Sequence, residues 1–260
     1  MSAFDGAEAP IGASEQPSLE EWLRAEPFTL AMSSGYFGFF AHAGVLTALG
    51  EKGLTPAATR ASSAGAMVTA LWAAGVEPEQ IGRELLQIKR EDFWDPGIGF
   101  GLLKGQRFDT TLRRILPIAE ISECAVPVHI SVYDIFRRET EVLDDGDIAS
   151  AIRASCARPG LFQPVMINGR PKFDGGIKDH DGYSGAPADE RIFHHRLITT
   201  RPKGSTAEPQ PRVMAEHPNI RALEIDSLPR VSVRTLGAGK AAYELAWLST
   251  VQALDRPTDP

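Results

Sequence analysis

The sequence is poor in cysteine, in long apolar runs and in positive charge. Cys124 and Cys156 are its two cysteines, too few for a disulfide framework or a cysteine-based metal site, and we interpret them as buried free thiols in a reducing compartment. No apolar run reaches the roughly 20 residues of a membrane-spanning helix. Residues 1–16 are acidic and lack the basic and apolar regions of a signal peptide. We therefore expect a cytoplasmic protein in which residues 1–25 are a flexible leader.

The charge balance excludes further classes of partner. The net charge of −7 and the pI near 5.4 argue against nucleic acid, because neutralising phosphates requires clustered Lys and Arg. They also argue against broad electrostatic attraction to anionic membranes. The acidic turn at residues 144–147 lacks the ligand spacing of an EF-hand, so we interpret it as a helix cap rather than a metal site.

What the chain does contain is enough apolar material for a sizeable core. It has 260 residues, of which 43% are hydrophobic, which suits one large α/β domain or two small ones. Predicted strands alternate with predicted helices from Pro27 onward, which is typical of a mainly parallel sheet covered on both faces. Because no internal repeat or linker interrupts this pattern, we expect residues 26–260 to form a single domain.

The local patterns place the individual elements. Strands are expected at residues 27–32, 57–61, 126–133, 139–143, 165–167, 170–173, 196–200 and 221–225. Helices are expected near 18–24 and at 41–52, 64–74, 148–156 and 238–254, with another that begins at Pro78. The proline-rich stretch 203–212 reads as a surface loop. The aromatic and glycine-rich stretch 92–106 is either a packed connector or a flap over an apolar substrate.

Ser63 stands where a predicted strand meets a predicted helix. Its surroundings, with Ala61 and Gly65 two positions to either side, approach the G-x-S-x-G pattern of a nucleophile elbow. Small residues are needed there because the strand and helix backbones meet in a tight turn. A serine at such a turn exposes its hydroxyl at the positive end of a helix dipole. The alternative is that Ser63 is an ordinary helix N-cap.

Two other segments carry residues that suit the same chemistry. The turn at 34–38 contains Gly35 and Gly38, whose conformational freedom lets backbone N–H groups point outward as in an oxyanion hole. Asp174 follows a predicted hairpin and precedes two glycines, so its carboxylate would be exposed and able to accept a proton from Ser63. The alternatives are a plain connecting turn at 34–38 and a plain Asp-Gly-Gly turn.

Four segments in this order resemble those of the patatin-like phospholipases. They are the glycine-rich opening at 34–46, the serine motif at 61–65, the segment 152–162 that leads to the acidic residue, and the Asp-Gly-Gly motif at 173–176. The resemblance covers roughly residues 28–185. It implies a three-layer α/β/α sandwich and hydrolysis of the acyl esters of lipids, without a metal or organic cofactor.

The resemblance also assigns roles to particular residues. It implies a catalytic dyad in which Asp174 deprotonates Ser63, and Ser63 attacks the ester carbonyl to form an acyl-enzyme. It implies an oxyanion hole built from the backbone N–H groups of Gly35, Tyr36, Phe37, Gly38 and Ala64. Small residues would support the two catalytic motifs at Ala61, Gly65, Gly175 and Gly176.

The sequence departs from the family pattern in two places. The opening turn has no Arg or Lys where relatives carry a basic residue, and Ala61 replaces a glycine. A less electropositive oxyanion hole leaves open an alternative function, a lipid-binding or interaction protein with weak or no catalysis. Any membrane contact would be peripheral, through the loop 93–103 and the aromatic residues at 36–40.

The histidines offer a triad as a further alternative. His180, His194 and His195 follow Ser63 and Asp174 in the chain order of an α/β-hydrolase triad. In those enzymes several strands precede the serine, whereas few structured residues precede Ser63. The pattern therefore favours a dyad. For His42, we expect a helix-face side chain that is hydrogen-bonded near the sheet edge.

Overall fold

The structure is a computed structural model that describes residues 17–198 and 211–257. Residues 1–16 of the expected leader lie outside this range, but its last part forms helix α1 (Leu19–Ala25). Ser18 caps this helix, because its hydroxyl accepts a hydrogen bond from the Glu21 N–H while the Glu21 carboxylate accepts one from the Ser18 N–H. Leu19 and Trp22 are buried, so α1 belongs to the folded domain rather than to a leader.

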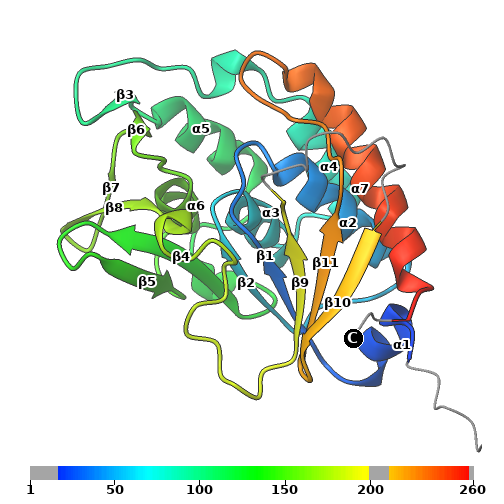
Figure 1. The fold of residues 1–260 in the computed structure, drawn as a ribbon. Coiled ribbons are helices and arrows are strands. Elements are labelled where there is room, and N and C mark those ends of the chain that lie inside the picture. Colours follow the sequence, from blue (N-terminus) through cyan, green and yellow to red (C-terminus); the bar gives the residue numbers. More distant parts are fainter. Residues whose placement is uncertain (1–16, 199–210, 258–260) are drawn as a thin grey trace, which may run out of the picture.

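A nine-stranded sheet forms the centre of the molecule (Figure 1). Its strands are β1 (Thr29–Met32), β2 (Ala58–Ser62), β4 (Val128–Asp134), β5 (Glu139–Leu143), β7 (Val165–Ile167), β8 (Arg170–Asp174), β9 (Ile192–Arg196), β10 (Pro211–His217) and β11 (Ile220–Ile225). The strands from β11 through β9, β1 and β2 to β4 are parallel neighbours. Antiparallel pairs flank this parallel centre, with β10 on β11 at one side and β5, β8 and β7 at the other.

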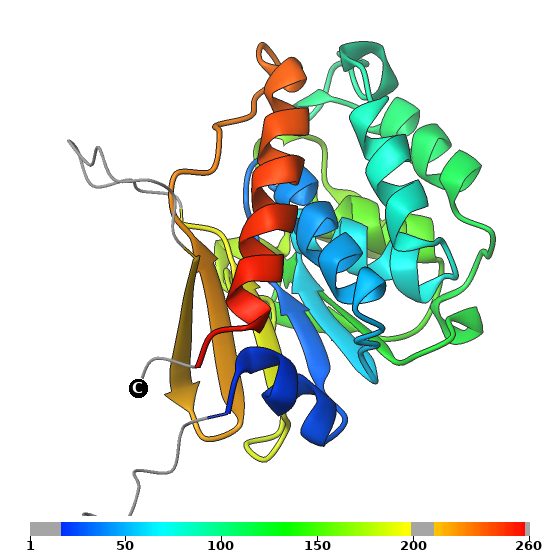
Figure 2. The same cartoon turned by 90° about the vertical axis from the view of Figure 1, so that its right-hand side faces the viewer.

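Helices lie on one face of the sheet, some packed against the strands and others against those inner helices. They are α2 (Phe39–Glu51), α3 (Ala64–Ala73), α4 (Pro78–Leu86), α5 (Gln106–Ile115), α6 (Ile148–Ser155) and α7 (Gly239–Leu254). Figure 2 shows this helical layer on one side of the sheet. Helices α2 and α3 are apolar on nearly all sides and are buried between the sheet and the outer helices, as their sequences predict. No helix among the described residues combines the length and apolarity needed to cross a bilayer.

The opposite face of the sheet is covered by the segment 178–191. Tyr183 of this segment packs edge-on against the ring of His194 in β9. Glu190 accepts hydrogen bonds from Thr29 of β1 and Arg60 of β2. The predicted α/β class, three layers with a mainly parallel central sheet, is confirmed. Within the described residues, the segment 178–191 lies on the face opposite the helices.

The hairpin turn and the helix cap that the sequence predicts are both present. Asn168 and Gly169 both have positive φ, 50° and 73°, and form the turn that joins β7 to β8. Asp147 caps α6, because its carboxylate accepts a hydrogen bond from the Ser150 N–H.

Other predictions need correction. The strand expected at 196–200 is β9, which lies earlier because its centre contains the polar residues His194 and His195; Thr199 and Thr200 lie outside the described residues. Most of the loop expected at 203–212 also lies outside them, but its last two residues begin β10. The stretch 92–106 contains the short strand β3 (Gly101–Leu103), which pairs with β6 (Gly160–Phe162). Helix α5 has a polar composition and was not predicted.

Candidate active site

Ser63 forms a sharp turn between β2 and α3. Its backbone has φ 52° and ψ −116°, a strained conformation for a residue with a side chain, and α3 begins at the next residue. A Cβ atom at Gly65 would lie 2.2 Å from the Met32 carbonyl oxygen. The small residue at position 65 therefore lets α3 pack directly on β1, as an elbow requires.

Strand β4 brings Ser63 and Asp174 together. Strand β2 pairs with the first half of β4, up to Ser62 opposite Ser131. Strand β8 runs in the opposite direction and pairs with the second half, with Asp174 opposite Val132. Because β5 pairs with β4 across both of these stretches, β2 and β8 share its other edge. The carboxyl ends of β2 and β8 thus meet beside adjacent residues of β4.

The two side chains are hydrogen-bonded. The Ser63 hydroxyl donates to Oδ2 of Asp174 at 2.8 Å, within the 2.6–3.2 Å expected for a nucleophile and its base. The other carboxylate oxygen, Oδ1, accepts a hydrogen bond from the Gly176 N–H, also at 2.8 Å. The Asp174 N–H donates to the Ala157 carbonyl at 3.0 Å. These contacts fix the carboxylate with one oxygen directed at the serine.

Burial makes Asp174 a stronger base than an ordinary aspartate. The carboxylate was expected to be exposed, but Asp174 is buried, with only 9% of the residue exposed, because it lies at the inner end of β8. Desolvation raises its pKa from 3.8 to about 6. Hydrogen bonds from Ser63 and Gly176 and the charge of Arg158 act in the opposite direction but do not cancel this effect. At neutral pH the carboxylate is ionised and has a raised affinity for the serine proton.

Neighbouring polar groups hold the elbow in place. The Ser63 N–H donates to the Ser155 hydroxyl at 2.8 Å, and that hydroxyl donates to the Ser131 carbonyl of β4 at 2.7 Å. The Cys156 thiol donates to the Ser63 carbonyl at 3.3 Å. Burial and, after it, the charge of Asp174 raise the pKa of Cys156, so this thiol is a protonated donor rather than a competing nucleophile.

The turn after β1 faces the same site. The N–H groups of Gly35, Tyr36 and Phe37 have no hydrogen-bond partner among the described residues, and all three residues line the cavity beside Ser63. Ala64 also lines it. Gly38 differs, because its N–H donates to the Gly35 carbonyl at 2.9 Å. Gly38 therefore leaves the expected set of oxyanion donors, because its N–H is already hydrogen-bonded.

The glycines of both motifs are required by close approach rather than by unusual dihedral angles. In the turn after β1, the residue with positive φ is Phe37, at 56°. A Cβ atom at Gly35 or Gly38 would lie within 2.4 Å of the Leu197 side chain. A Cβ atom at Gly175 would lie 2.1 Å from the Ser131 carbonyl oxygen, and one at Gly176 would lie 2.2 Å from the Ser34 hydroxyl.

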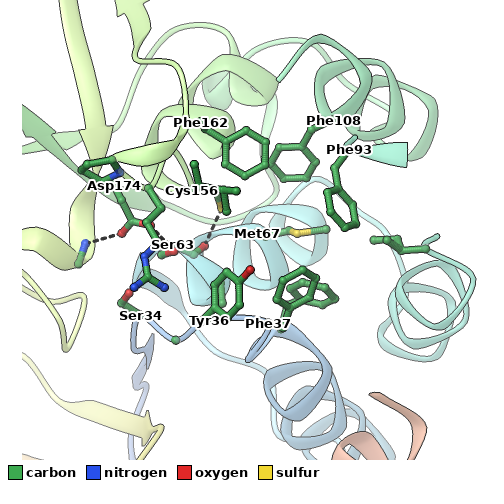
Figure 3. Close-up of a pocket in the computed structure, with 18 of the residues that line it drawn as sticks. Ser34, Tyr36, Phe37, Ser63, Met67, Phe93, Phe108, Cys156, Phe162 and Asp174 are labelled. Atoms are coloured by element: carbon green, nitrogen blue, oxygen red, sulfur yellow. Dashed lines mark hydrogen bonds between the residues drawn. The ribbon is translucent and has the colours of Figure 1, made fainter. Parts of the chain in front are cut away.

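An apolar cavity of about 340 Å³ extends from the dyad. Figure 3 shows Ser63 and Asp174 at one end, with Phe93 toward the other end. Between them the wall is formed by apolar side chains and aromatic rings, among them Tyr36, Phe37, Met67, Phe108 and Phe162. This volume lies in the usual range of small-molecule sites, roughly 300–1,000 Å³.

Arg158 supplies a positive charge at the rim of the cavity. Its guanidinium carbon lies 5.1 Å from the centroid of the Tyr36 ring, and its side chain makes no hydrogen bond or ion pair with the described residues. Sequence reasoning did not single out Arg158 or Ser155. Both lie in the segment 152–162, and the contact of Ser155 with the elbow depends on the end of α6 packing beside Ser63.

No histidine among the described residues hydrogen-bonds Ser63 or Asp174. His194 and His195 are buried within β9, and His42 bonds to Ser33 and His195 as a helix-face histidine near the sheet edge. Within residues 17–198 and 211–257, no three His, Cys, Asp or Glu residues are grouped so that they could hold a metal ion.

Comparisons with known proteins show which family the chain belongs to. The family model of the patatin-like phospholipases matches residues 30–186. Uncharacterised NTE family proteins of Mycobacterium bovis and Mycobacterium tuberculosis are 33% identical over 153 residues, which is 58% of this chain and 42% of theirs. The chain thus spans less than half the length of these relatives.

A solved structure is similar in fold. The crystal structure of VipD from Legionella pneumophila matches with a TM-score of 0.65 at 14% identity, over 88% of this chain and 67% of that one. The family match covers the strand before the glycine turn, the serine elbow and the Asp-Gly-Gly motif. The chain therefore belongs to the patatin-like phospholipase family.

Proposed function

We propose that this protein is a serine acyl hydrolase that cleaves the acyl esters of lipids through a Ser63–Asp174 dyad. The observation that carries the proposal is the 2.8 Å hydrogen bond from Ser63 to a buried carboxylate at the end of an apolar cavity. An acyl chain would lie in the cavity, because its wall is mostly apolar. Family membership supports the same chemistry.

The reaction would proceed in two steps. Asp174 accepts the proton of Ser63 as the serine oxygen bonds to the ester carbonyl carbon, which gives a tetrahedral intermediate with a negatively charged oxygen. When the intermediate collapses, the leaving alcohol takes the proton from Asp174 and Ser63 remains acylated. Water then attacks the acyl-enzyme, with Asp174 accepting its proton, and the fatty acid leaves as the serine is reprotonated.

The negative oxygen would be held by backbone donors. The N–H groups of Gly35, Tyr36, Phe37 and Ala64 are the candidates. Arg158 would add the positive charge that the turn lacks, because it reaches the same cavity from the segment after α6. This cation favours catalysis over the alternative of a lipid-binding protein on the same scaffold.

A fluorophosphonate probe tests the proposal, because it reacts covalently with activated serines. We expect the probe to label the unaltered protein, labelling to vanish in Ser63→Ala, and labelling to slow in Asp174→Asn. Ser62→Ala is the matched control, since Ser62 is adjacent and fully buried and should label normally. A folded protein that binds fatty acid but is not labelled would instead support the lipid-binding alternative.

We also propose that the loop between η1 (Arg90–Asp92) and β3 contacts a lipid surface. Ile98 and Phe100 are 103% and 87% exposed. Large apolar side chains that are this exposed and close together are typical of an interaction surface. Gln163 donates to the Ile98 carbonyl at 3.0 Å, which ties the loop to the segment after the cavity residue Phe162. The loop therefore places apolar side chains close to the cavity rim.

Sedimentation with phosphatidylcholine vesicles measures this contact. The double variant Ile98→Ser, Phe100→Ser should bind vesicles several-fold more weakly while hydrolysing water-soluble esters normally. Phe136→Ser is the control, because Phe136 is 71% exposed but lies in the turn between β4 and β5. Equal loss of vesicle binding in the control would contradict a role for the loop.

A further inference from the structure

Two buried histidines form a hydrogen-bonded pair that the proposed reaction does not use. His42 stands in the first turn of α2 and His195 in β9, and both are completely buried. Their Nδ1 atoms lie 2.8 Å apart. The Nε2 atom of His42 lies 2.9 Å from the carbonyl oxygen of Ser33.

The partners determine where the protons of the pair lie. A carbonyl oxygen only accepts, so Nε2 of His42 carries a hydrogen and donates it to Ser33. Burial lowers the pKa of His42 to about 4, so the ring is neutral at pH 7 and its Nδ1 is a bare acceptor. His195 must then donate from its own Nδ1. The result is a directed chain from His195 through His42 to the Ser33 carbonyl.

Ser33 is the last residue before the turn that faces Ser63. Its N–H donates to the His195 carbonyl at 3.2 Å, and its hydroxyl accepts a hydrogen bond from the Leu197 N–H at 2.9 Å. The Leu197 side chain fills the space beside Gly35 and Gly38. The end of β9 therefore holds the start of the turn through its backbone, through Leu197, and through the histidine pair.

A purely structural role would not require this chemistry. Apolar side chains of similar volume would fill the same space between α2 and β9 without burying four ring nitrogens, which is costly unless each is hydrogen-bonded. One of the four, Nε2 of His195, has no partner among the described residues. What the pair adds over apolar packing is a fixed direction for the Ser33 carbonyl, and hence for the peptide that leads into the turn.

We propose that His42 and His195 are positioning residues that aim the backbone N–H groups of the turn at 35–37 toward the oxyanion formed on Ser63. The inference rests on the proposed function. Donors must be placed to within a fraction of an ångström to stabilise a transition state, and a misplacement of about 1 Å costs on the order of 100-fold in rate. Neither histidine touches the substrate in this arrangement.

Substitutions at position 42 separate the hydrogen bond from the packing. Glutamine places an amide N–H near the position of Nε2 and can still donate to Ser33, whereas leucine cannot. We expect His42→Leu to lower kcat for p-nitrophenyl butyrate by about 100-fold with KM within threefold, and His42→Gln to stay within about tenfold of the unaltered protein. His194→Leu is the control, because His194 is equally buried but points to the opposite face of β9.

A second readout reports on the oxyanion directly. An alkyl trifluoromethyl ketone forms an oxyanion when Ser63 adds to it, while the corresponding alcohol does not. His42→Leu should weaken inhibition by the ketone by about the same factor as it lowers kcat/KM, because both depend on the oxyanion. Inhibition by the alcohol should not change. If His42→Leu fails to fold, His42→Asn serves in its place, because its shorter amide does not reach Ser33.

The inference is overturned if the folded Leu or Asn variant keeps kcat within threefold, or if Gln rescues no better than Leu. It is also overturned if His42→Leu weakens inhibition by the ketone and by the alcohol equally. Failure of the proposed function looks different, since the unaltered protein would then neither hydrolyse esters nor label at Ser63.

Discussion

Ser63 and Asp174 meet because their strands run toward each other along one edge of β4. Ser62 pairs with Ser131, and Asp174 pairs with the next residue, Val132. The hydroxyl and the carboxylate are therefore positioned by backbone pairing in the centre of the sheet, and the side chains need only their ordinary reach to form the 2.8 Å hydrogen bond. Placement by strand pairing holds the two side chains more precisely than placement by loops would.

The pH dependence of ester hydrolysis should follow the titration of Asp174. Burial raises this pKa to about 6, and only the ionised carboxylate accepts the serine proton. The value of kcat/KM should therefore fall about tenfold between pH 7 and pH 5. Stopped assays with p-nitrophenyl esters measure the profile. A flat profile over this range would rule out Asp174 as the base.

Asp174→Asn should be inactive and yet more stable at pH 7. The folded pKa of about 6 lies above the ordinary 3.8, so ionisation at neutral pH favours the unfolded chain, by about 3 kcal/mol at most. Replacing the carboxylate with a neutral amide removes this cost. The gain should be full above the folded pKa of about 6 and shrink as the pH falls below it, and it should vanish only below the unfolded pKa of 3.8, where Asp174 is protonated in both states. Urea unfolding at pH 7 and pH 4.5 tests this, and an equal gain at both would contradict it.

Arg158→Gln should lower kcat/KM for esters roughly tenfold, because the guanidinium stands beside the cavity in which negative charge develops. Arg158→Lys should retain more activity than Arg158→Gln. Since the side chain is exposed, 0.5 M salt should narrow the difference between the unaltered protein and the Gln variant. The control Arg137→Gln removes an exposed arginine from the turn between β4 and β5. The same loss in that variant would show a general charge effect instead.

Gly65→Ala should destabilise the fold by about 1–3 kcal/mol or more. Its Cβ would lie 2.2 Å from the Met32 carbonyl oxygen, so α3 would have to move away from β1 and take Ser63 with it. Gly237→Ala provides the comparison, because a Cβ there meets nothing within 4 Å. Thermal unfolding and fluorophosphonate labelling should both change for Gly65→Ala and stay constant for the control. A folded, normally labelled Gly65→Ala would contradict the packing argument.

The sequence by itself determined the local features of the site. The elbow at Ser63, the hairpin turn at Asn168 and Gly169, and the helix cap at Asp147 each follow from a few neighbouring residues whose steric or hydrogen-bonding needs are local. The apolar composition of α3 likewise predicted its burial. These signals were enough to identify the α/β class and to single out Ser63 and Asp174 together.

The tertiary structure decided what depends on contacts between distant segments. Strand β9 was misplaced because its residues His194 and His195 are polar and are buried only once 178–191 and α2 cover them. Strand β10 and the polar helix α5 were missed. The glycines of the turn at 35–38 turned out to make room for Leu197. Arg158, the cation that lines the cavity beside that turn, lies far along the chain. No local pattern encodes these relationships, since they arise when β8 and β9 pack beside β4 and β1.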